Sequence, residues 1–328
     1  MEQDLYFPAD VAAMIRKGER LLLAGDIRLL SQLPEGEWIA GTTNMFLLPS
    51  GAGTTSYDRI FACPLPDFVT GVAIREYDRN SIRHIFNEAP ANGFTVLILP
   101  FGSEPHLTYA VNAGSYENFA TRPICGWVSG GASLATVMTD KCYAVSGMNR
   151  QAYSDMAVAM HIAFPCNKYA ELHIFNPYRQ GSEKINFISD GIVVKKVLVN
   201  GVQCDFAGYL RDTGFDLTLP FVADYSGALI NVVVSGINGD EVYMTTPVFR
   251  SLDYYTGEIN PQMNDAAVIN DTVIFSVYCI SNYLKQKISE IHPKRMSGPM
   301  VFGEIAYQLL NKTTVYATVG DTIPASKA

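Results

Sequence analysis

The chain has 328 residues, of which 48% are hydrophobic and 17% charged. This is the composition of a folded globular protein and excludes a disordered or low-complexity chain. The formal net charge of −8, without a cluster of Lys and Arg, argues against a surface that follows the phosphates of a nucleic acid.

The N-terminal segment does not have the pattern of a secretion signal. Met1–Asp4 is acidic, and the first apolar run, Leu21–Ala24, is too short for a signal-peptide core. No apolar run approaches the roughly 18 to 20 residues that a membrane-spanning helix needs. Six scattered cysteines without a C-x-x-C pair predict free thiols. We therefore expect a cytoplasmic protein with no membrane association.

The first half of the chain alternates short helical and extended segments. Helices are predicted over residues 7–15, 27–33, 78–87 and 109–119, from apolar residues at helical spacing. Strands are predicted over residues 20–24, 37–48 with a break at Gly41, 94–99, 124–128, 143–145 and 155–164. A loop rich in Pro, Ser, Gly and Thr is expected over residues 49–55. The nearly continuous apolar character of 124–128 and 155–164 indicates strands buried on both faces, although periodicity alone does not exclude a buried helix for the latter.

The second half is rich in signals for antiparallel strands. Asn200-Gly201 and Asn238-Gly239 each lie between apolar runs, and such pairs favour the turn of a β-hairpin. Further on, a buried strand is predicted over 272–279, a helix over 282–291, a short extended segment over 300–302 and a final strand over 313–319. Ile305 and Leu309 lie four residues apart, which predicts a short helix over 303–310.

These elements predict an α/β fold class: two subdomains of mixed, partly antiparallel sheets packed with helices. The composition of the chain changes near Phe164-Pro165, which predicts the boundary between the two subdomains there. Residues 1–164 and 165–328 are then the two subdomains.

Neither glycine-rich stretch matches a nucleotide-binding motif. Gly51-Ala52-Gly53-Thr54-Thr55 lacks both the third glycine of a dinucleotide fingerprint and the Gly-Lys-Ser/Thr of a phosphate loop. Gly126, Gly130 and Gly131 follow a strand, but no lysine comes next. Both stretches are better explained as ordinary turns.

The five histidines follow no zinc-binding spacing. His161 lies in an apolar segment, where a histidine with its hydrogen bonds satisfied inside the core is the simpler interpretation. A single His or Cys remains open as an axial haem ligand, so a haem-based gas sensor is one alternative. We otherwise expect no metal and no resident cofactor.

Nucleophilic catalysis is a second alternative. No Gly-x-Ser-x-Gly motif is present, but Cys279, His292 and Glu304 form a constellation if the fold brings them together. Cys125 is the other candidate thiol. A buried, inert cysteine explains each position more simply, because reactivity needs a depressed thiol pKa. We therefore expect a protein that is not an enzyme.

The C-terminal segment combines aromatic residues with one acidic residue. Tyr278, Tyr283 and Tyr307 accompany Glu304, and aromatic walls with a few polar groups are typical of a small-molecule pocket. Core packing with the hydroxyls at the surface explains the tyrosines more simply. In the helix predicted over 303–310, Glu304 would occupy the first turn, where the helix dipole favours a carboxylate. Asn311 would cap the other end.

The same segment carries an ordered set of motifs. The buried strand ending at Cys279 is followed by a helix, then by Gly298-Pro299-Met300-Val301-Phe302-Gly303-Glu304-Ile305, then by Asn311-Lys312-Thr313-Thr314. This order resembles the C-terminal half of FIST-domain proteins. Residues 38–43, 123–130 and 154–158 are similar to the family's first Gly-polar turn, its Gly-rich strand end and the strand after it.

The chain departs from the family in two places. Cys279 is followed by Ile280-Ser281-Asn282, where the family often has a Gly-Arg pair, and Trp127 stands where a small residue is common. If these positions line the ligand site, the ligand differs from the family's usual one.

The resemblance implies a sensory domain that binds a small, amino-acid-like molecule and signals through a partner protein. One branch of the family is linked to haem and nitric oxide sensing. Because no kinase or cyclase segment is attached, we expect the output to pass through a separate protein or through oligomerisation. The ligand contacts that the resemblance implies are Gly41, Thr42, Cys125, Gly126, Trp127, Tyr278, Cys279, Gly303, Glu304 and Asn311. In this set Gly303 allows close approach, Glu304 offers a carboxylate to an ammonium group, and Asn311 both donates and accepts.

Overall fold

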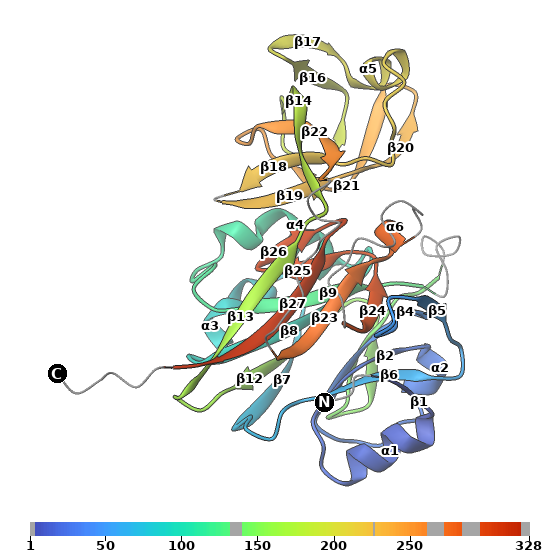
Figure 1. Cartoon of the computed structure of the whole chain (residues 1–328), viewed down its shortest axis with the longest axis vertical. Coiled ribbons are helices and arrows are strands. Elements are labelled where there is room, and N and C mark those ends of the chain that lie inside the picture. The colour runs from blue at the N-terminus through green and yellow to red at the C-terminus, as the bar shows by residue number, and fades with distance from the viewer. Residues whose placement is uncertain (1–3, 132–139, 226, 261–271, 284–295, 323–328) are drawn as a thin grey trace, which may run out of the picture.

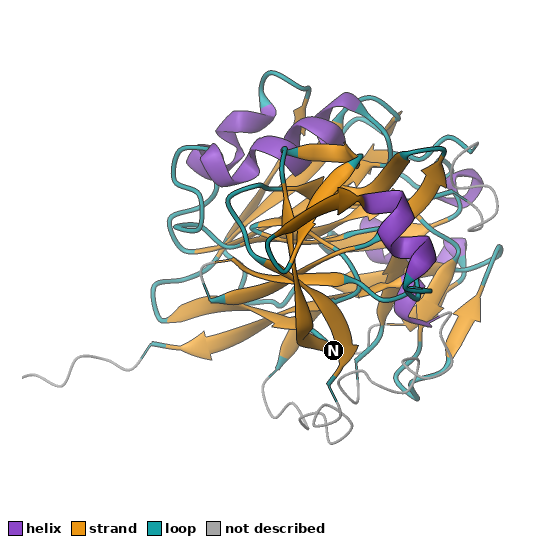
Figure 2. Cartoon of the chain, turned by 90° about the horizontal axis from the view of Figure 1, so that it is seen from above, coloured by secondary structure: helices purple, strands orange, loops and turns teal. Residues whose placement is uncertain are grey.

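A computed structural model of the chain describes residues 4–131, 140–225, 227–260, 272–283 and 296–322. Within these residues the fold is mixed α/β, as predicted, with strands far outnumbering helices. The strands form four six-stranded sheets and one three-stranded sheet. Figure 1 shows three of the sheets in a lower body and two in an upper lobe. Viewed from above, the helices lie mainly outside the layers of strands (Figure 2).

The first sheet is built from the N-terminal half of the chain. Its strands, in spatial order, are β1 (Asp4–Tyr6), β6 (Ile60–Pro64), β2 (Leu21–Gly25), β3 (Trp38–Thr42), β10 (Ala144–Ser146) and β11 (Gln151–Tyr153). Helices α1 (Pro8–Arg16) and α2 (Ile27–Leu30) contribute Val11 and Leu30 to a core with Leu21 and Leu23 of β2. Leu22 belongs to the central core instead, because successive side chains of a strand point to opposite faces. The sheet is therefore buried on both sides at β2.

The second sheet contains strands from the middle and the end of the chain. Its order is β26 (Gln308–Leu310), β25 (Glu304–Ala306), β9 (Ile124–Ser129), β8 (Gly93–Pro100), β12 (Ala157–Ala163) and β7 (Gly71–Tyr77). One face is covered by η1 (Ile82–His84), α3 (Ile85–Glu88), α4 (Glu104–Asn112) and η2 (Ala113–Ser115). Phe86 and Tyr109 from these helices pack with Leu97 and Leu99 of β8.

The third sheet closes the body. Its order is β13 (Lys168–Phe175), β27 (Thr314–Asp321), β23 (Val273–Cys279), β24 (Gly298–Val301), β4 (Met45–Leu47) and β5 (Gly53–Thr55), and α6 (Ile280–Tyr283) follows β23. The ring centroids of Trp127 and Phe275 lie 5.7 Å apart, so the second and third sheets meet in the central core. Ile39 and Phe46 complete that core from β3 and β4.

The lobe is formed by residues 178–259. Its first sheet has the order β17 (Val202–Asp205), β16 (Lys196–Val199), β14 (Tyr178–Phe187), β22 (Tyr254–Ile259), β18 (Phe221–Tyr225) and β19 (Ala228–Val232). The second is β15 (Gly191–Val194), β21 (Glu241–Val248) and β20 (Val234–Asn238), and α5 (Phe206–Asp212) packs beside them. Asn260 N donates to Pro177 O at 2.9 Å, so the chain leaves and re-enters the body at adjacent points.

The helix predicted over 303–310 was wrong. The segment is the tight hairpin β25–β26, in which Glu304 pairs with Trp127 of β9 and Tyr307 turns with φ +60°. Ile305 and Leu309 lie directly opposite each other across this hairpin. A spacing of four residues therefore fits the hairpin as well as a helical turn, and pairing with a buried strand decides between them.

The ends of other predicted helices and strands differ from the observed ends by a few residues. The helix predicted over 109–119 is α4, which begins at Glu104 because the Ser103 hydroxyl oxygen caps it by accepting from His106 N. The strand predicted over 37–48 breaks between β3 and β4 rather than at Gly41. The expected loop 49–55 ends in the strand β5.

Two further predictions are only partly covered by the structure. Most of the helix predicted over 282–291 lies outside the described residues, of which α6 begins at Ile280. The boundary near residue 164 stays a prediction. Strands from both sides of it pair in two sheets, as β4 does with β24 and β9 with β25.

Candidate functional site

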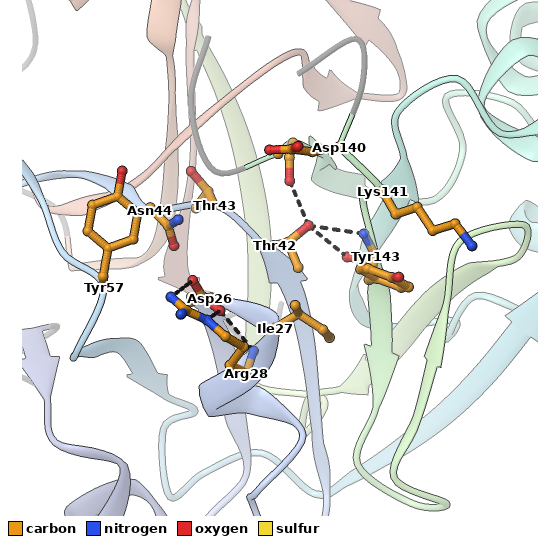
Figure 3. Close-up of a pocket in the computed structure, with 13 residues that line it drawn as sticks. Asp26, Ile27, Arg28, Thr42, Thr43, Asn44, Tyr57, Asp140, Lys141 and Tyr143 are labelled. Carbon is orange, nitrogen blue, oxygen red and sulfur yellow. Dashed lines mark hydrogen bonds and ion pairs between the residues drawn. The ribbon is translucent and has the colours of Figure 1, made fainter. Parts of the chain in front are cut away.

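A cavity of about 400 Å³ opens where the parallel strands β2 and β3 end (Figure 3). Parallel strands place their carboxyl ends at one edge, and ligand sites in α/β sheets commonly lie there. The lining residues are Gly25, Asp26, Ile27, Arg28, Thr42, Thr43, Asn44, Tyr57, Gly130, Gly131, Asp140, Lys141 and Tyr143. Polar groups from β2, β3 and the segment after β9 thus converge on one space.

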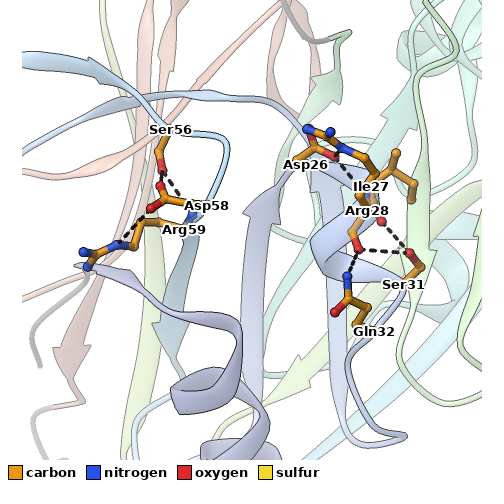
Figure 4. Close-up of polar contacts among 8 residues, drawn as sticks. All are labelled: Asp26, Ile27, Arg28, Ser31, Gln32, Ser56, Asp58 and Arg59. Carbon is orange, nitrogen blue, oxygen red and sulfur yellow. Dashed lines mark hydrogen bonds and ion pairs between the residues drawn. The ribbon is translucent and has the colours of Figure 1, made fainter.

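Asp26 and Arg28 form an ion pair at the wall of this cavity. Asp26 caps α2 by accepting from Arg28 N at 2.8 Å, and its carboxylate accepts from Arg28 Nε at 2.9 Å and Nη2 at 2.7 Å (Figure 4). The hydrogen bonds from Arg28 lower the pKa of Asp26 despite its burial, so the carboxylate is ionised at neutral pH. The Nη1 hydrogens of Arg28 make no hydrogen bond within the described residues, so they are available to a further acceptor such as a ligand.

The side-chain oxygen of Asn44 is a buried hydrogen-bond acceptor to which no described residue donates. Its side chain is 3% exposed and lies between Tyr57 and Thr43 in Figure 3. A hydrogen bond to Asp26, which helps to lower the pKa of that carboxyl, uses the amide nitrogen. Oδ1 has no hydrogen-bond partner in the part of the chain that the structure describes. An unpaired buried acceptor is unfavourable by about 1–3 kcal/mol, and a ligand N–H or O–H would satisfy it.

Thr42 and Thr43 hold the cavity wall in place. Thr42 Oγ1 donates to Gly130 O at 2.7 Å and accepts from Tyr143 N at 3.0 Å. Thr43 Oγ1 donates to Met300 O at 2.8 Å in β24. These hydroxyls tie the ends of three sheets together, so the wall is preorganised before any ligand binds.

Of the predicted residues in the first half of the chain, Thr42 alone lines the cavity. Gly41 and Gly126 serve close packing: a Cβ would lie 2.4 Å from Trp127 Nε1 at Gly41 and 1.9 Å from Leu97 O at Gly126. Cys125 and Trp127 are buried in the central core.

The predicted residues in the second half gather elsewhere, around Glu304. This carboxyl has no solvent exposure, and its Oε2 accepts from Thr313 N at 3.1 Å and Thr313 Oγ1 at 2.9 Å. Burial raises its pKa to about 8, although the Thr313 bonds, the Cys279 thiol and the Lys312 ammonium act in the opposite direction. Within the described residues, Oε1 has no hydrogen-bond partner. Cys279 and Glu304 are thus brought together as the sequence suggested, whereas His292 lies outside the described residues.

Lys312 is the member of this cluster that sequence reasoning missed. It is 3% exposed, and burial lowers the pKa of its ammonium group. Its Nζ lies 5.9 Å from the centroid of the Tyr178 ring in the lobe. Tyr278, Gly303 and Asn311 are the chain neighbours of the cluster residues: Tyr278 packs with Met300, and Asn311 O accepts from Asn231 Nδ2 at 3.0 Å. Only the unusual burial identifies Lys312, and nothing in its sequence neighbourhood does.

The cysteine-enzyme alternative depends on thiols that are buried, and the haem-sensor alternative depends on a histidine whose ring nitrogens are already hydrogen-bonded. Burial raises the pKa of the Cys279 thiol to about 12, with a contribution from Glu304, and raises that of Cys125 as well. Both ring nitrogens of His161 are hydrogen-bonded, Nε2 to Tyr77 OH and Nδ1 to Thr95 Oγ1, each at 2.8 Å. Within the described residues no group of three His, Cys, Asp or Glu side chains could hold a metal ion.

In the described part of the chain, no helix is long and apolar enough to cross a membrane. Residues 6–320 match a family described as a family of unknown function (DUF6976). No curated protein matches the chain.

Proposed function

The chain belongs to DUF6976, a family of unknown function, and from the chemistry of its cavity we propose that it binds a small, amino-acid-like molecule at the ends of β2 and β3 as a sensory protein. The observation that carries the proposal is the buried, unpaired Oδ1 of Asn44 in the cavity wall. A ligand ammonium or amide group would donate to it and remove the cost of leaving it unpaired.

The Asp26–Arg28 ion pair beside Asn44 suits a zwitterion. A ligand ammonium at Asn44 Oδ1 lies next to the ionised carboxylate of Asp26. A carboxylate on the adjacent ligand carbon would then accept from Arg28 Nη1, and a carboxylate–guanidinium contact is a strong, charge-assisted one. The two opposite charges of an amino acid thus match the two opposite charges of the pair.

The size of the cavity also supports a ligand of this class. About 400 Å³ is near the lower end of small-molecule sites, which span about 300–1,000 Å³. A free amino acid or a similar metabolite fits this volume. The sensory role and the signalling partner rest on the resemblance to FIST-domain proteins.

The test is a thermal-shift screen of the whole chain against the free amino acids and their decarboxylated and deaminated analogues. Binding to the native state raises the melting temperature, and at a ligand concentration of 100 Kd it stabilises by about 2.7 kcal/mol. We expect a shift with at least one zwitterion and a smaller one with each analogue, because each analogue lacks one of the two charges.

The matched variants are Asn44→Leu and Asn186→Leu. Both replace an amide by an apolar side chain of similar size, but Asn186 lies in the lobe and donates to Asp253 instead of lining the cavity. Asn44→Leu should abolish the ligand-induced shift while Asn186→Leu keeps it. An equal shift in both variants, or no shift with any zwitterion, would reject the proposal.

The cysteine-enzyme and haem alternatives have their own readouts. Alkylation of Cys279 or Cys125 in the native protein at neutral pH would support the enzyme, and full protection of both would remove it. A Soret band after haem is supplied would support the haem sensor, and its absence would remove that alternative.

A further inference from the structure

A second cavity, of about 460 Å³, lies on the outer side of the body, away from the ends of β2 and β3. One wall is the turn after β7 together with η1, and the other is α4 with η2. Arg79, Asn80, Arg83 and His84 line the first wall, and Thr108 and Asn112 line the second. None of these residues belongs to the Asn44 cavity.

The first wall is rich in hydrogen-bond donors. Arg83 Nε donates to His84 Nε2 at 3.1 Å, and the terminal nitrogens of Arg83 make no hydrogen bond within the described residues. Because His84 Nε2 acts as the acceptor in this contact, Nδ1 carries the proton and is a further donor. Arg79 makes one long contact, from Nη1 to Glu104 Oε1 at 3.4 Å, which leaves most of its donors unused.

The nearby carboxylates do not neutralise Arg83. Glu117 also lines the cavity, but its carboxylate accepts from Asn87 Nδ2 at 2.8 Å. Glu104 reaches Arg79 alone. No carboxylate in the described residues lies within ion-pair distance of Arg83, so its charge is available to an anion.

The second wall offers acceptors instead. Asn112 Nδ2 donates to Thr108 O at 3.0 Å, and this contact leaves Oδ1 as the unused end of the amide. Ser115 Oγ donates to Asn112 O at 2.7 Å, so its lone pairs also remain as acceptors. A ligand that spans the cavity therefore needs an oxyanion at one end and hydroxyl groups at the other.

We propose that this cavity is a second binding site, for a small hydroxylated oxyanion such as a sugar phosphate or a sugar acid. Arg83 and Arg79 bind the oxyanion through charge-assisted hydrogen bonds, and Asn112 and Ser115 accept from the ligand hydroxyls. The ligand differs from the zwitterion of the Asn44 cavity in charge and in shape, and no residue lines both cavities.

The experiment is calorimetric titration of the whole chain with four probes: ribose 5-phosphate, gluconate, inorganic phosphate and ribose. We expect ribose 5-phosphate or gluconate to bind more tightly than inorganic phosphate, and ribose to bind least. The comparison of ribose 5-phosphate with gluconate identifies which oxyanion the arginines prefer. Absence of binding by both hydroxylated anions at millimolar concentration overturns the proposal.

Two arginine variants and one cavity variant complete the test. Arg83→Gln should weaken binding at least about tenfold, since it removes a charged donor from an exposed position without disturbing the core. Arg16→Gln, at the exposed end of α1, should bind like the wild type. Asn44→Leu should also bind like the wild type, so failure of the zwitterion site and failure of this site are distinguishable. Unchanged binding by Arg83→Gln contradicts the proposal.

Discussion

The Glu304 carboxyl has no contact with solvent, and burial holds its pKa at about 8 in the folded chain, against 4.5 ordinarily. Between these values the folded protein keeps a proton that the unfolded chain has lost. Unfolding therefore releases a proton, and stability falls as the pH rises through this window. The stabilisation is fully present below pH 4.5 and is lost as the pH passes about 8.

We predict that the free energy of unfolding of the wild type decreases from pH 5 to pH 8 more steeply than that of Glu304→Gln, which has no proton to lose. Urea titrations at each pH unit measure both slopes. Lys312 contributes in the opposite sense, because its lowered pKa favours stability at rising pH, but only in the window below its ordinary value of 10.5. Parallel profiles for the two proteins would show that Glu304 is ionised in the folded state.

Gly126 fills a position that no side chain fits. Its φ is +146°, and an added Cβ would lie 1.9 Å from Leu97 O in the neighbouring strand β8. We predict that Gly126→Ala destabilises by at least about 3 kcal/mol, from strain and overpacking together. Gly71→Ala in β7 is the control, since nothing lies within 4 Å of its Cβ, and it should change stability by about 1 kcal/mol or less. Chemical denaturation compares the two, and similar small effects would count against the packing role.

At the scale of single elements, the hairpin β16–β17 depends on the backbone of its turn. Asn200 and Gly201 have φ of +50° and +87°, as the Asn-Gly pair predicted, and the Cβ of an alanine at 201 would meet open space. We predict that Gly201→Ala costs about 1–2 kcal/mol, which is the conformational penalty alone. Gly236→Ala, also in open space but without positive φ, should cost less than Gly201→Ala in the same thermal unfolding assay.

The elements also show what local sequence determines. The Asn200-Gly201 turn and the apolar strand β8 were predictable, because a turn dipeptide and a continuous apolar run act over a few residues. The hairpin β25–β26 was not, because Ile305 and Leu309 satisfy both a helical and a hairpin pattern until β9 pairs with them.

Of the two candidate clusters, the sequence pointed to Glu304 and Cys279 but not to Asn44. An asparagine after a strand is ordinary in sequence, and its Oδ1 becomes a buried acceptor without a partner only once the folded chain forms the cavity wall. No sequence signal marked Lys312 either, because the Tyr178 ring that lies 5.9 Å from its Nζ is distant along the chain.

At the scale of the whole molecule, the body is assembled from distant segments, and the lobe is made from one. Strands β4 and β9 find partners beyond residue 297, whereas both lobe sheets come wholly from residues 178–259. The lobe also has its own aromatic packing, with the Phe187 and Tyr254 ring centroids 4.9 Å apart.

We therefore predict different outcomes for two truncations. A chain in which a short Gly-Ser linker replaces residues 178–259 should still unfold in one cooperative transition. Its melting temperature should be lower, because Lys312 loses its contact with the Tyr178 ring. The fragment 1–164 should show no cooperative transition, because β4 loses β24 and β9 loses β25, which leaves each strand with a partner on one side only. Calorimetry and circular dichroism distinguish the cases, and cooperative unfolding of the fragment would instead support a subdomain boundary at residue 164.

Because the chain leaves the body at Pro177 and returns at the adjacent Asn260, another domain could be inserted at this point. Pro177 and Asn260 are joined by a backbone hydrogen bond, so a domain whose own termini lie close together can be inserted between them. A fluorescent protein inserted in place of residues 178–259 would therefore be held to the body at two adjacent points of attachment.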